Sequence, residues 1–252
     1  MKIRLLSDLH TEFRMPYKTH PVSEYRGEDV LVLAGDIASG SSNVVDVLKH
    51  FKSCGFPRVI YVPGNHEYYG TSYTDFNKKI RDKCRDLRGI HVLNPGSVVI
   101  DDVLFVGATL WTNFDDDFLA QSAARRAIND FRVIQDFDTD VCTKAFYDQW
   151  DYICGEYAAR GDLKVVVVTH FLPAQHCIAP RWRGPNVLNH YFANHLDNAI
   201  VDMQNTTWLF GHTHDHVETQ IGETRLYANP HGYWNSGETE MGGFDPYFTV
   251  TV

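Results

Sequence analysis

The amino-acid sequence predicts an α/β fold, and two features of its pattern carry that prediction. Short apolar runs rich in β-branched residues recur along the chain, and segments with apolar residues at helical spacing lie between them. Five runs that are apolar at nearly every position lie at residues 3–6, 30–34, 59–62, 165–168 and 208–210. Such runs are typical of strands buried on both faces of a sheet. Strands that alternate with helices indicate an α/β architecture.

The segments between these runs carry helical signatures. A helix is expected over 42–52, where a serine start precedes apolar residues at helical spacing, and a longer amphipathic helix over 69–88, closed by Gly89. Further helices are expected over 120–134, 143–159 and, with a looser pattern, 189–203. Shorter strands are expected over 90–93, 98–106, 217–221, 224–228 and 247–252. These strands suggest a second, more antiparallel sheet packed on the first.

Length and composition favour one ordinary globular domain. The chain has 252 residues, of which 44% are hydrophobic and 22% charged. No linker, low-complexity tract or repeat divides it, so residues 1–252 are expected to form a single domain. The 23 basic and 32 acidic residues give a net charge of −9. That balance argues against a protein held on nucleic acid or an anionic membrane mainly by a basic field.

Cysteine usage and the lack of membrane-type runs predict a cytoplasmic protein. The five cysteines are odd in number, scattered and without CxxC pairing, which is typical of reduced intracellular thiols. Met1 leads directly into the first strand pattern, without the layout of a signal peptide. No apolar run approaches the length of a membrane span, so no membrane partner is expected.

Each of the five apolar runs ends abruptly in residues of the type that bind metal ions. In chain order these residues are Asp8 and His10, Asp36, Asn65 and His66, His170, and finally His212 and His214. In open α/β sheets the ligand crevice lies beyond the carboxyl ends of the strands, which is where these residues occur. On an extended segment, side chains at i and i+2 point to the same side, so the last two histidines can face one site together.

Seven of these residues make a donor set that suits two metal ions better than one. They offer oxygen and nitrogen atoms and no thiolate: Asp8, His10, Asp36, Asn65, His170, His212 and His214. A single tetrahedral structural zinc is saturated by four ligands, usually including cysteine. Seven donors instead suit two borderline divalent ions with open positions, bridged by one carboxylate at a separation of about 3.5–4 Å.

Two such ions would supply the chemistry of phosphoester hydrolysis without a protein nucleophile. They can lower the pKa of a bridging water to form hydroxide near neutral pH, and they can clamp the phosphoryl oxygens of an in-line displacement. The leaving oxygen still needs a proton or a positive charge. His66, which lies beside Asn65 but is not needed as a ligand, is placed to assist the leaving group.

Taken in order, the blocks Asp-x-His, Gly-Asp, Gly-Asn-His-Glu, a lone strand-end His and Gly-His-x-His resemble the calcineurin-like metallophosphoesterases across the whole chain. The resemblance implies a four-layer αββα sandwich, with two mixed sheets face to face and helices outside. It assigns Asp8, His10 and His214 to one metal ion, and Asn65, His170 and His212 to the other. Asp36 would bridge the two ions, and His66 matches the catalytic histidine of the family.

Two details of the sequence compare the chain with particular members of this family. The closing segment 227–233 is similar to small bacterial and phage members, which carry Asn-Pro-x-Gly-Tyr after the last histidines. Phe171 follows His170 where many relatives have a second histidine. A phenyl ring cannot contact a phosphate as an imidazole can, so the substrate preference of those relatives does not transfer.

The leading hypothesis is a metal-dependent phosphoesterase that hydrolyses phosphodiester or phosphomonoester bonds of a small phosphorylated substrate. Two divalent ions are expected, Mn²⁺ first, with Fe, Zn, Co or Ni as alternatives because nitrogen and oxygen ligands accept all of them. The alternative function is a nuclease, for which DNA or RNA is only the substrate. A scaffold protein without catalysis is disfavoured because no ligand of the set is missing. Substrate-binding residues and the oligomeric state stay open.

Several other polar residues have a structural interpretation beside a functional one. Glu67 is expected to orient its neighbours rather than to catalyse, and His216 to be structural, since no ligand position remains for it. His231 can be a pocket residue or a structural one. The acidic run 115–117 looks like a metal cluster in sequence, but a solvated loop is the better interpretation. The histidines left without an assigned role are His176, His190 and His195.

The segment 171–188 directly follows His170 and is expected to form a rim over the metal ions. Arg181 or Arg183 could hold a phosphate or carboxylate there, and a plain surface loop is equally compatible with the sequence. Trp111 and the Tyr68–Tyr69 pair could stack on a ring of the substrate, although aromatic core packing is the commoner role.

Overall fold

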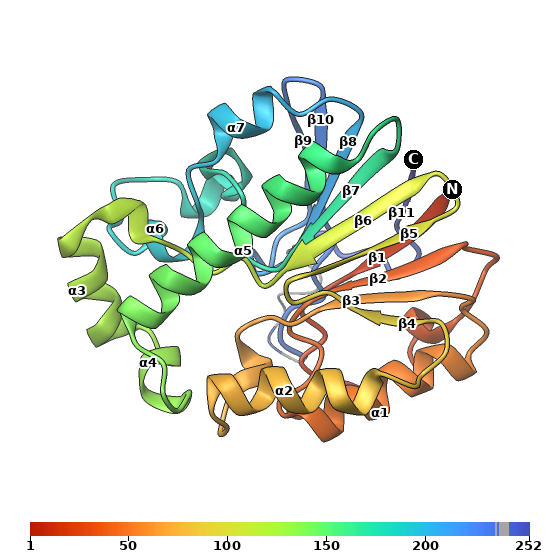
Figure 1. The fold of residues 1–252 in the computed structure, drawn as a ribbon. Helices are drawn as coiled ribbons and strands as arrows, with labels where there is room; N and C mark the ends of the chain where they lie inside the picture. The colour runs from red at the N-terminus through yellow and green to blue at the C-terminus, as the bar shows by residue number, and fades with distance from the viewer. Residues whose placement is uncertain (235, 237–241) are drawn as a thin grey trace.

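The apolar runs of the sequence form strands in two mixed β-sheets (Figure 1). The computed structural model describes residues 1–234, 236 and 242–252. One sheet has five strands in the order β11-β1-β2-β3-β4, and the other has six in the order β5-β6-β7-β8-β10-β9. The strands of the first sheet are β1 (Lys2–Leu6), β2 (Val30–Ala34), β3 (Val59–Val62), β4 (Ile90–Val92) and β11 (Thr249–Thr251). Those of the second are β5 (Gly96–Ile100), β6 (Val103–Ala108), β7 (Lys164–Thr169), β8 (Thr206–Phe210), β9 (Val217–Ile221) and β10 (Thr224–Ala228).

Parallel pairing dominates both sheets. Strands β1 to β4 run parallel to their neighbours, and β11 joins β1 antiparallel at one edge. In the second sheet β6, β7, β8 and β10 are parallel, whereas β5 and β9 pair antiparallel at the two edges. The expected division into sheets was partly wrong: β4 and β11 belong to the first sheet, and β7 and β8 belong to the second, where antiparallel pairing is confined to the edges. The five strands with polar ends are divided between the sheets, β1 to β3 in one and β7 and β8 in the other.

Side chains along the central strands alternate between two apolar layers. Val32 of the first sheet and Val168 and Leu209 of the second lie in one fully buried layer between the sheets. Their chain neighbours Leu33 and Trp208 are equally buried, but on the outer faces under the helices. Burial on both faces explains why the sequence of these strands is continuously apolar.

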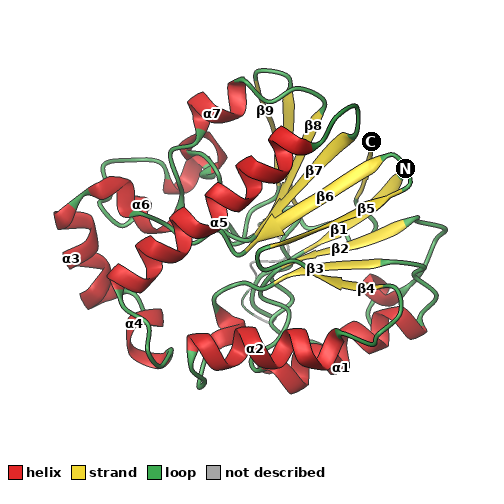
Figure 2. Ribbon diagram, in the orientation of Figure 1, coloured by secondary structure: helices red, strands yellow, loops and turns green. Residues whose placement is uncertain are grey.

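Helices cover the outer faces of both sheets and complete four layers (Figure 2). Helices α1 (Ser41–Ser53) and α2 (Tyr73–Cys84) pack on the first sheet near β3 and β4. Helix α5 (Thr139–Ala159) packs on β6 of the second sheet, and α7 (Asp197–Val201) packs on β9. The expected four-layer αββα arrangement is confirmed. Among the described residues, no helix combines the length and the apolar character that a membrane span requires.

Three of the predicted elements are divided in the structure. The single strand predicted over 98–106 is a hairpin of β5 and β6, because Asp101 adopts a left-handed φ of 55° between them. The helix predicted over 120–134 is two helices, α3 (Phe118–Ala127) and α4 (Asp130–Val133), because Ile128 is extended. The segment 189–203 likewise forms α6 (Asn189–Phe192) and α7, with extended Ala193 between them. The helix predicted over 69–88 is shorter than expected, and the one predicted over 143–159 begins earlier, at the residue that Asp138 caps.

The carboxyl ends of the strands from both sheets meet at one place. The Nδ1 atom of His170, just after β7, lies 2.9 Å from the carbonyl oxygen of Ala34 at the end of β2. A Cβ atom on Gly211, just after β8, would lie 2.6 Å from the same oxygen. The ends of one sheet are thus in direct contact with the ends of the other, and the polar residues of all five loops share this junction.

Candidate metal centre

Sharp turns of the backbone follow the strands and aim the polar side chains at one another. Positive φ angles, which residues other than glycine rarely adopt, occur at five of the seven expected ligands: Asp8 (53°), His10 (45°), Asp36 (53°), His212 (67°) and His214 (50°). Strain of on the order of 1–3 kcal/mol per residue persists only where the surrounding structure fixes it, and it gathers at functional sites.

Two glycines let these turns approach each other without a side chain between them. A Cβ atom on Gly64 would lie 2.1 Å from Oδ1 of Asp36, and one on Gly211 would lie 2.8 Å from Oδ2 of Asp8. Any larger residue at either position would push a carboxylate away from the junction. This contact explains the glycines of the Gly-Asn-His-Glu and Gly-His-x-His blocks.

The first group of donors consists of Asp8, His10 and His214, each of which offers a ligand atom within 4.8 Å of the other two. The Nε2 atoms of the two histidines lie 3.2 Å apart. Nε2 of His214 lies 3.4 Å from Oδ1 of Asp8. Three donors that converge at such distances leave room for one cation between them.

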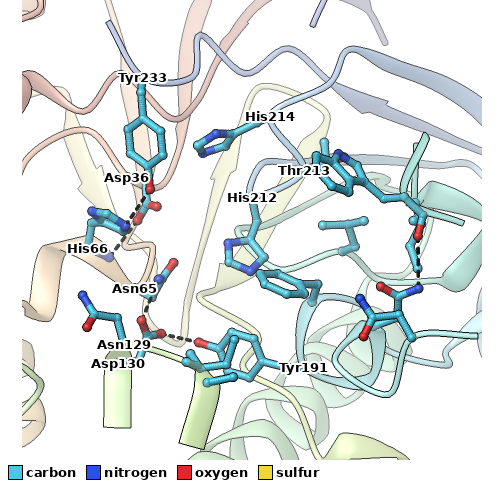
Figure 3. A pocket seen from close by; sticks show the side chains of 18 of the residues that line it. Asp36, Asn65, His66, Asn129, Asp130, Tyr191, His212, Thr213, His214 and Tyr233 are labelled. Carbon is cyan, nitrogen blue, oxygen red and sulfur yellow. Dashed lines mark hydrogen bonds between the residues drawn. The ribbon is translucent and has the colours of Figure 1, made fainter. Parts of the chain in front are cut away.

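The second group consists of Asp36, His170 and His212, with the same mutual separation of ligand atoms. Nε2 of His170 lies 3.4 Å from Oδ2 of Asp36 and 3.2 Å from Oδ1 of Asn65. Oδ2 of Asp36 also lies 3.8 Å from Nε2 of His10, so it faces both groups. The structure therefore brings all seven expected ligands together, and Figure 3 shows several of them around one pocket.

Hydrogen bonds to the backbone fix the orientation of these side chains. Nδ1 of His170 faces the Ala34 carbonyl oxygen, which leaves its Nε2 lone pair directed at the donors. The backbone N–H of His212 donates to the Asp8 carboxylate at 3.1 Å. Glu67 lies beneath the junction and accepts from the backbone N–H groups of Asp36, Ile37 and Gly64 at 3.0, 2.8 and 2.8 Å. It supports the turns and does not line the pocket.

The charges of the site favour a bound cation. Burial raises the pKa of Asp8, but a hydrogen bond from His214 and the nearby histidines outweigh it and lower that pKa to about 2. Burial also opposes ionisation of Asp36, yet His170 and His66 hold its pKa well below the usual range. Burial lowers the pKa of His212 well below its usual value. Ionised carboxylates and neutral imidazole are the states in which these groups bind metal. Burial lowers the pKa of His170, but Asp36 and Asp8 outweigh it and raise that pKa to about 9, so a metal ion at its Nε2 atom would displace a proton.

The residues present fit divalent ions that prefer oxygen and nitrogen ligands. Nε2 of His212 is shielded from solvent and has no hydrogen-bond partner within the described part of the chain, so a ligand role would satisfy it. The two buried carboxylates need positive charge nearby, which ions held between the groups would provide. No cysteine belongs to either group.

His66 lies beside the donors, and its ring is contacted on one face and at both ring nitrogens. Nδ1 of His66 lies 3.2 Å from Oε1 of Glu12, and the ring stacks on Tyr69 with centroids 4.3 Å apart. The hydroxyl of Tyr233 lies 3.4 Å from Nε2 of His66. Burial lowers the pKa of His66, but Asp36 and Glu12 outweigh it and raise that pKa above its usual value.

Sequence reasoning missed Glu12, which lies between two histidines of the site. Its Oε1 atom is 3.2 Å from Nδ1 of His10 as well as from Nδ1 of His66. Burial raises the pKa of Glu12, but these two rings outweigh it and lower that pKa to about 2. The residue is two positions after His10, and no motif distinguishes it from any other glutamate in the sequence.

Asp130 is a second residue that sequence reasoning missed. Its buried carboxylate accepts hydrogen bonds from Nδ2 of Asn65 at 3.1 Å, from the hydroxyl of Tyr69 at 2.7 Å, and from the hydroxyl of Tyr191. These bonds direct the amide oxygen of Asn65 towards His170. The break between α3 and α4 makes this placement possible. The single helix predicted over 120–134 gave no reason to expect Asp130 at the site.

The donors form one end of a cavity of about 440 Å³. Beside the donors, the lining includes many apolar and aromatic side chains, Ile128, Leu172, Ile178, Trp182, Tyr191 and Phe192, and three asparagines, Asn129, Asn186 and Asn189. Arg181 lines the rim but is paired with Asp215, from Nε at 3.0 Å and from Nη2 at 2.9 Å. Arg183 does not line the cavity, and it donates to the carbonyl oxygens of Ile178 and His176 within the rim loop.

The remaining candidates lie outside the cavity or serve its packing. Phe171 stacks on His212 with ring centroids 4.2 Å apart, and Trp111 and Tyr68 are fully buried in the core. His216 pairs with Glu218. His231 is buried, and it is not among the residues that line the cavity. Of the aromatic residues proposed to stack on a substrate ring, only Tyr69 lines the cavity.

Comparison with known proteins identifies a family for the sequence and solved structures with a similar fold. The sequence model of the calcineurin-like phosphoesterase family matches residues 1–216. An uncharacterized protein of Acanthamoeba polyphaga mimivirus is 27% identical over 291 residues, covering 99% of this chain and 96% of that protein. The fold is similar to that of the phosphopantetheinyl hydrolase PptH from Mycobacterium tuberculosis, with a TM-score of 0.79 at 17% identity, over 99% of this chain and 95% of that one. It is also similar to a dimetal phosphatase from Danio rerio, with a TM-score of 0.55 at 15% identity, over 92% and 88% of the chains.

Replacement of Asp130 by asparagine is expected to weaken metal binding. The carboxylate accepts three hydrogen bonds, and an amide in its place would turn one acceptor into a donor that faces other donors. Loss of a supporting partner of this kind lowers metal affinity by about 10–100-fold. Calorimetric titration of the metal-free protein with Mn²⁺ measures the change.

Asp162→Asn is the matched control, because Asp162 is exposed on the turn after α5 and its replacement removes the same charge. The control should bind Mn²⁺ as the unmodified protein does. Equal affinities in all three proteins would show that Asp130 does not support the metal centre through Asn65.

Proposed function

The chain belongs to the calcineurin-like phosphoesterase family, and on that premise we propose that it hydrolyses phosphoesters with a binuclear centre of divalent metal ions. Metal-dependent hydrolysis of phosphoesters is what the family supports in general. The observation that carries the binuclear centre is the position of Asp36, whose Oδ2 atom lies 3.4 Å from Nε2 of His170 and 3.8 Å from Nε2 of His10. One carboxylate oxygen thus faces two separate groups of donors.

The proposed ligands follow the two groups. Asp8, His10 and His214 would hold one ion, Asn65, His170 and His212 the other, and Asp36 both. Bound divalent ions supply positive charge to phosphoryl oxygens and lower the pKa of water. We propose Mn²⁺ as the native metal, with Fe, Zn, Co and Ni as alternatives, because the donor set is nitrogen and oxygen throughout.

His66 is proposed to assist the leaving group. Its Nδ1–H can donate to the Glu12 carboxylate 3.2 Å away, which leaves Nε2 on the side of the cavity. Stacking on Tyr69 keeps the plane of the ring fixed. A protonated Nε2 can donate to an oxygen that departs from phosphorus, and the nearby carboxylates of Glu12 and Asp36 favour the protonated ring.

The cavity favours a small substrate with one phosphate and an uncharged, ring-bearing or apolar alcohol part. Arg181 is the one arginine or lysine among the described residues that line the cavity, and Asp215 already neutralises it. The described lining of the cavity therefore has no unpaired arginine or lysine that could bind a further phosphate. Apolar and aromatic side chains such as Trp182 and Phe192 instead offer surface to the organic part of the ester.

The nuclease alternative has less support. Nucleic acid is held mainly by lysine and arginine contacts to successive phosphates, and the net charge of −9 opposes such binding. We therefore propose nucleic acid as a substrate only in second place. For the location of the protein we propose the cytoplasm, since all five cysteines are free thiols in the structure.

Removal of metal is expected to abolish turnover. The proposed reaction uses metal-activated water and not a protein nucleophile, so the chain without metal ions should not hydrolyse a chromogenic phosphodiester or phosphomonoester. Dialysis against a chelator should remove the activity and Mn²⁺ should restore it, as followed by release of p-nitrophenol. Protein that holds two ions per chain and still turns over neither ester would contradict the proposed function, and weak binding at every site would favour a scaffold instead.

Replacement of His66 by alanine is expected to leave metal binding intact and to reduce turnover. Loss of a proton donor costs about 10²–10⁴-fold when the leaving alkoxide is poor, and less for p-nitrophenol, which departs readily. Turnover of an alkyl and a p-nitrophenyl ester is measured side by side. His216→Ala is the control, because His216 pairs with Glu218 and does not line the cavity. If His66→Ala lost turnover equally on both esters, His66 would not be the proton donor to the leaving group.

A panel of phosphate esters is expected to separate the substrate classes. Esters with a single phosphate on a ring-bearing or apolar alcohol should show higher kcat/KM than nucleoside triphosphates or oligonucleotides, because the described wall offers no free cation. The panel includes a phosphopantetheine ester, which the name of the similar mycobacterial hydrolase suggests. Preference for labelled DNA or RNA would overturn the proposed substrate class in favour of the nuclease.

A further inference from the structure

A second cluster of metal-binding side chains lies outside the centre described above. Asp115, His190 and His195 each offer a ligand atom within 4.8 Å of the other two. Nδ1 of His195 lies 3.3 Å from Oδ2 of Asp115, and Nδ1 of His190 lies 3.9 Å from the same oxygen. The sequence suggested a solvated acidic loop at 115–117 and left both histidines without a role. The structure brings the first aspartate of that loop against both of them.

The backbone holds this cluster in place. Asp115 lies in the short 3-10 helix η4 (Phe114–Asp116), in which all three residues have positive φ angles of 55–58°. Thr112 connects the two parts of the cluster, because its hydroxyl donates to the His190 carbonyl oxygen at 2.7 Å and accepts from the Phe114 N–H at 2.9 Å. Thr112 thus connects the backbone of the Asp115 loop to the backbone of His190 before any ligand binds.

The donors of the cluster are available to a ligand. Nδ1 of His190 is shielded from solvent and has no hydrogen-bond partner within the described residues. An ion pair between Asp115 and His195 would account for one histidine and leave the nitrogen of the other unsatisfied. The neighbouring carboxylates are already engaged: Asp116 accepts from the hydroxyl of Tyr147, and Asp117 caps helix α3.

We propose that Asp115, His190 and His195 bind a further divalent ion of the Zn²⁺ class. Two imidazoles and one carboxylate are a ligand set that Zn²⁺, Co²⁺, Ni²⁺ and Cu²⁺ accept, and water completes the shell. The run of three aspartates adds negative potential around the position. Since no side chain of this cluster belongs to either donor group of the catalytic centre, the proposal does not depend on the proposed function.

The ion would stabilise one wall of the cavity. His190 belongs to α6, which also carries Tyr191 and Phe192 into that wall. An ion between α6 and η4 would fix this helix against the loop with three positive φ angles. Binding should raise the melting temperature by roughly 5 °C when Zn²⁺ is in about hundredfold excess over its Kd.

The experiment counts bound zinc in the full chain. Metal-free protein is loaded with Zn²⁺, separated from free ions by gel filtration, and analysed for metal by mass spectrometry. The double variant His190→Ala/His195→Ala should hold one ion per chain fewer than the unmodified protein. His176→Ala is the matched control, since His176 is an exposed histidine that pairs with Asp197 and has no place in the cluster. It should hold the same number of ions as the unmodified protein.

A second variant and a second readout cover the case in which the double variant fails to fold. Asp115→Asn keeps the size of the side chain, and it should lose the same ion and the added thermal stability. Equal zinc counts and equal melting temperatures in this variant and the unmodified protein would overturn the proposal. The comparison rests on a difference of one ion and not on turnover, so an inactive catalytic centre leaves its result unchanged.

Discussion

The candidate metal centre depends on direct contact between the loops at the ends of the two sheets. Gly64 lies against the Asp36 carboxylate and Gly211 against the Asp8 carboxylate, at distances that admit no Cβ atom. The left-handed backbone of five of the expected ligands is the local cost of this contact. Two sheets with fully buried strands on both faces, together with the support of Glu67 beneath, hold the loops in these conformations. A site on isolated loops could not keep so many strained residues in place.

Charge is arranged in layers around this junction. Two buried carboxylates, Asp8 and Asp36, stay ionised at its centre and create the need for cations. Two further carboxylates contact the expected ligands and His66: Asp130 orients the amide of Asn65, and Glu12 lies between His10 and His66. Many apolar and aromatic side chains line the rest of the cavity, and Arg181, the one arginine among the described lining residues, is neutralised by Asp215. The proposed chemistry is therefore confined to one end of the cavity, while the other end is left to recognise the organic part of a substrate.

The sequence predicts those residues whose role follows from the pattern of their immediate neighbours in the chain. Continuous apolar runs ended by Asp, Asn or His identify the strands and the seven donors, because parallel strands carry their carboxyl ends to the same edge. Local pattern does not show breaks that tertiary contacts stabilise, such as extended Ile128 in a segment of helical spacing. The role of Asp130 depends on that break and on tyrosines far along the chain, so no spacing reveals it. Likewise Asp115 meets His190 only through folding. A single domain over residues 1–252 stays a prediction from composition.

The central claim is that two adjacent cations share Asp36, and electron paramagnetic resonance of the Mn²⁺-loaded protein tests it most directly. The measurement uses the His190→Ala/His195→Ala variant, so that an ion bound by Asp115, His190 and His195 does not contribute. Two Mn²⁺ ions about 3.5–4 Å apart are expected to give an exchange-coupled spectrum once two ions per chain are bound. A spectrum of isolated Mn²⁺ ions at that loading, or saturation at a single ion, would contradict the account.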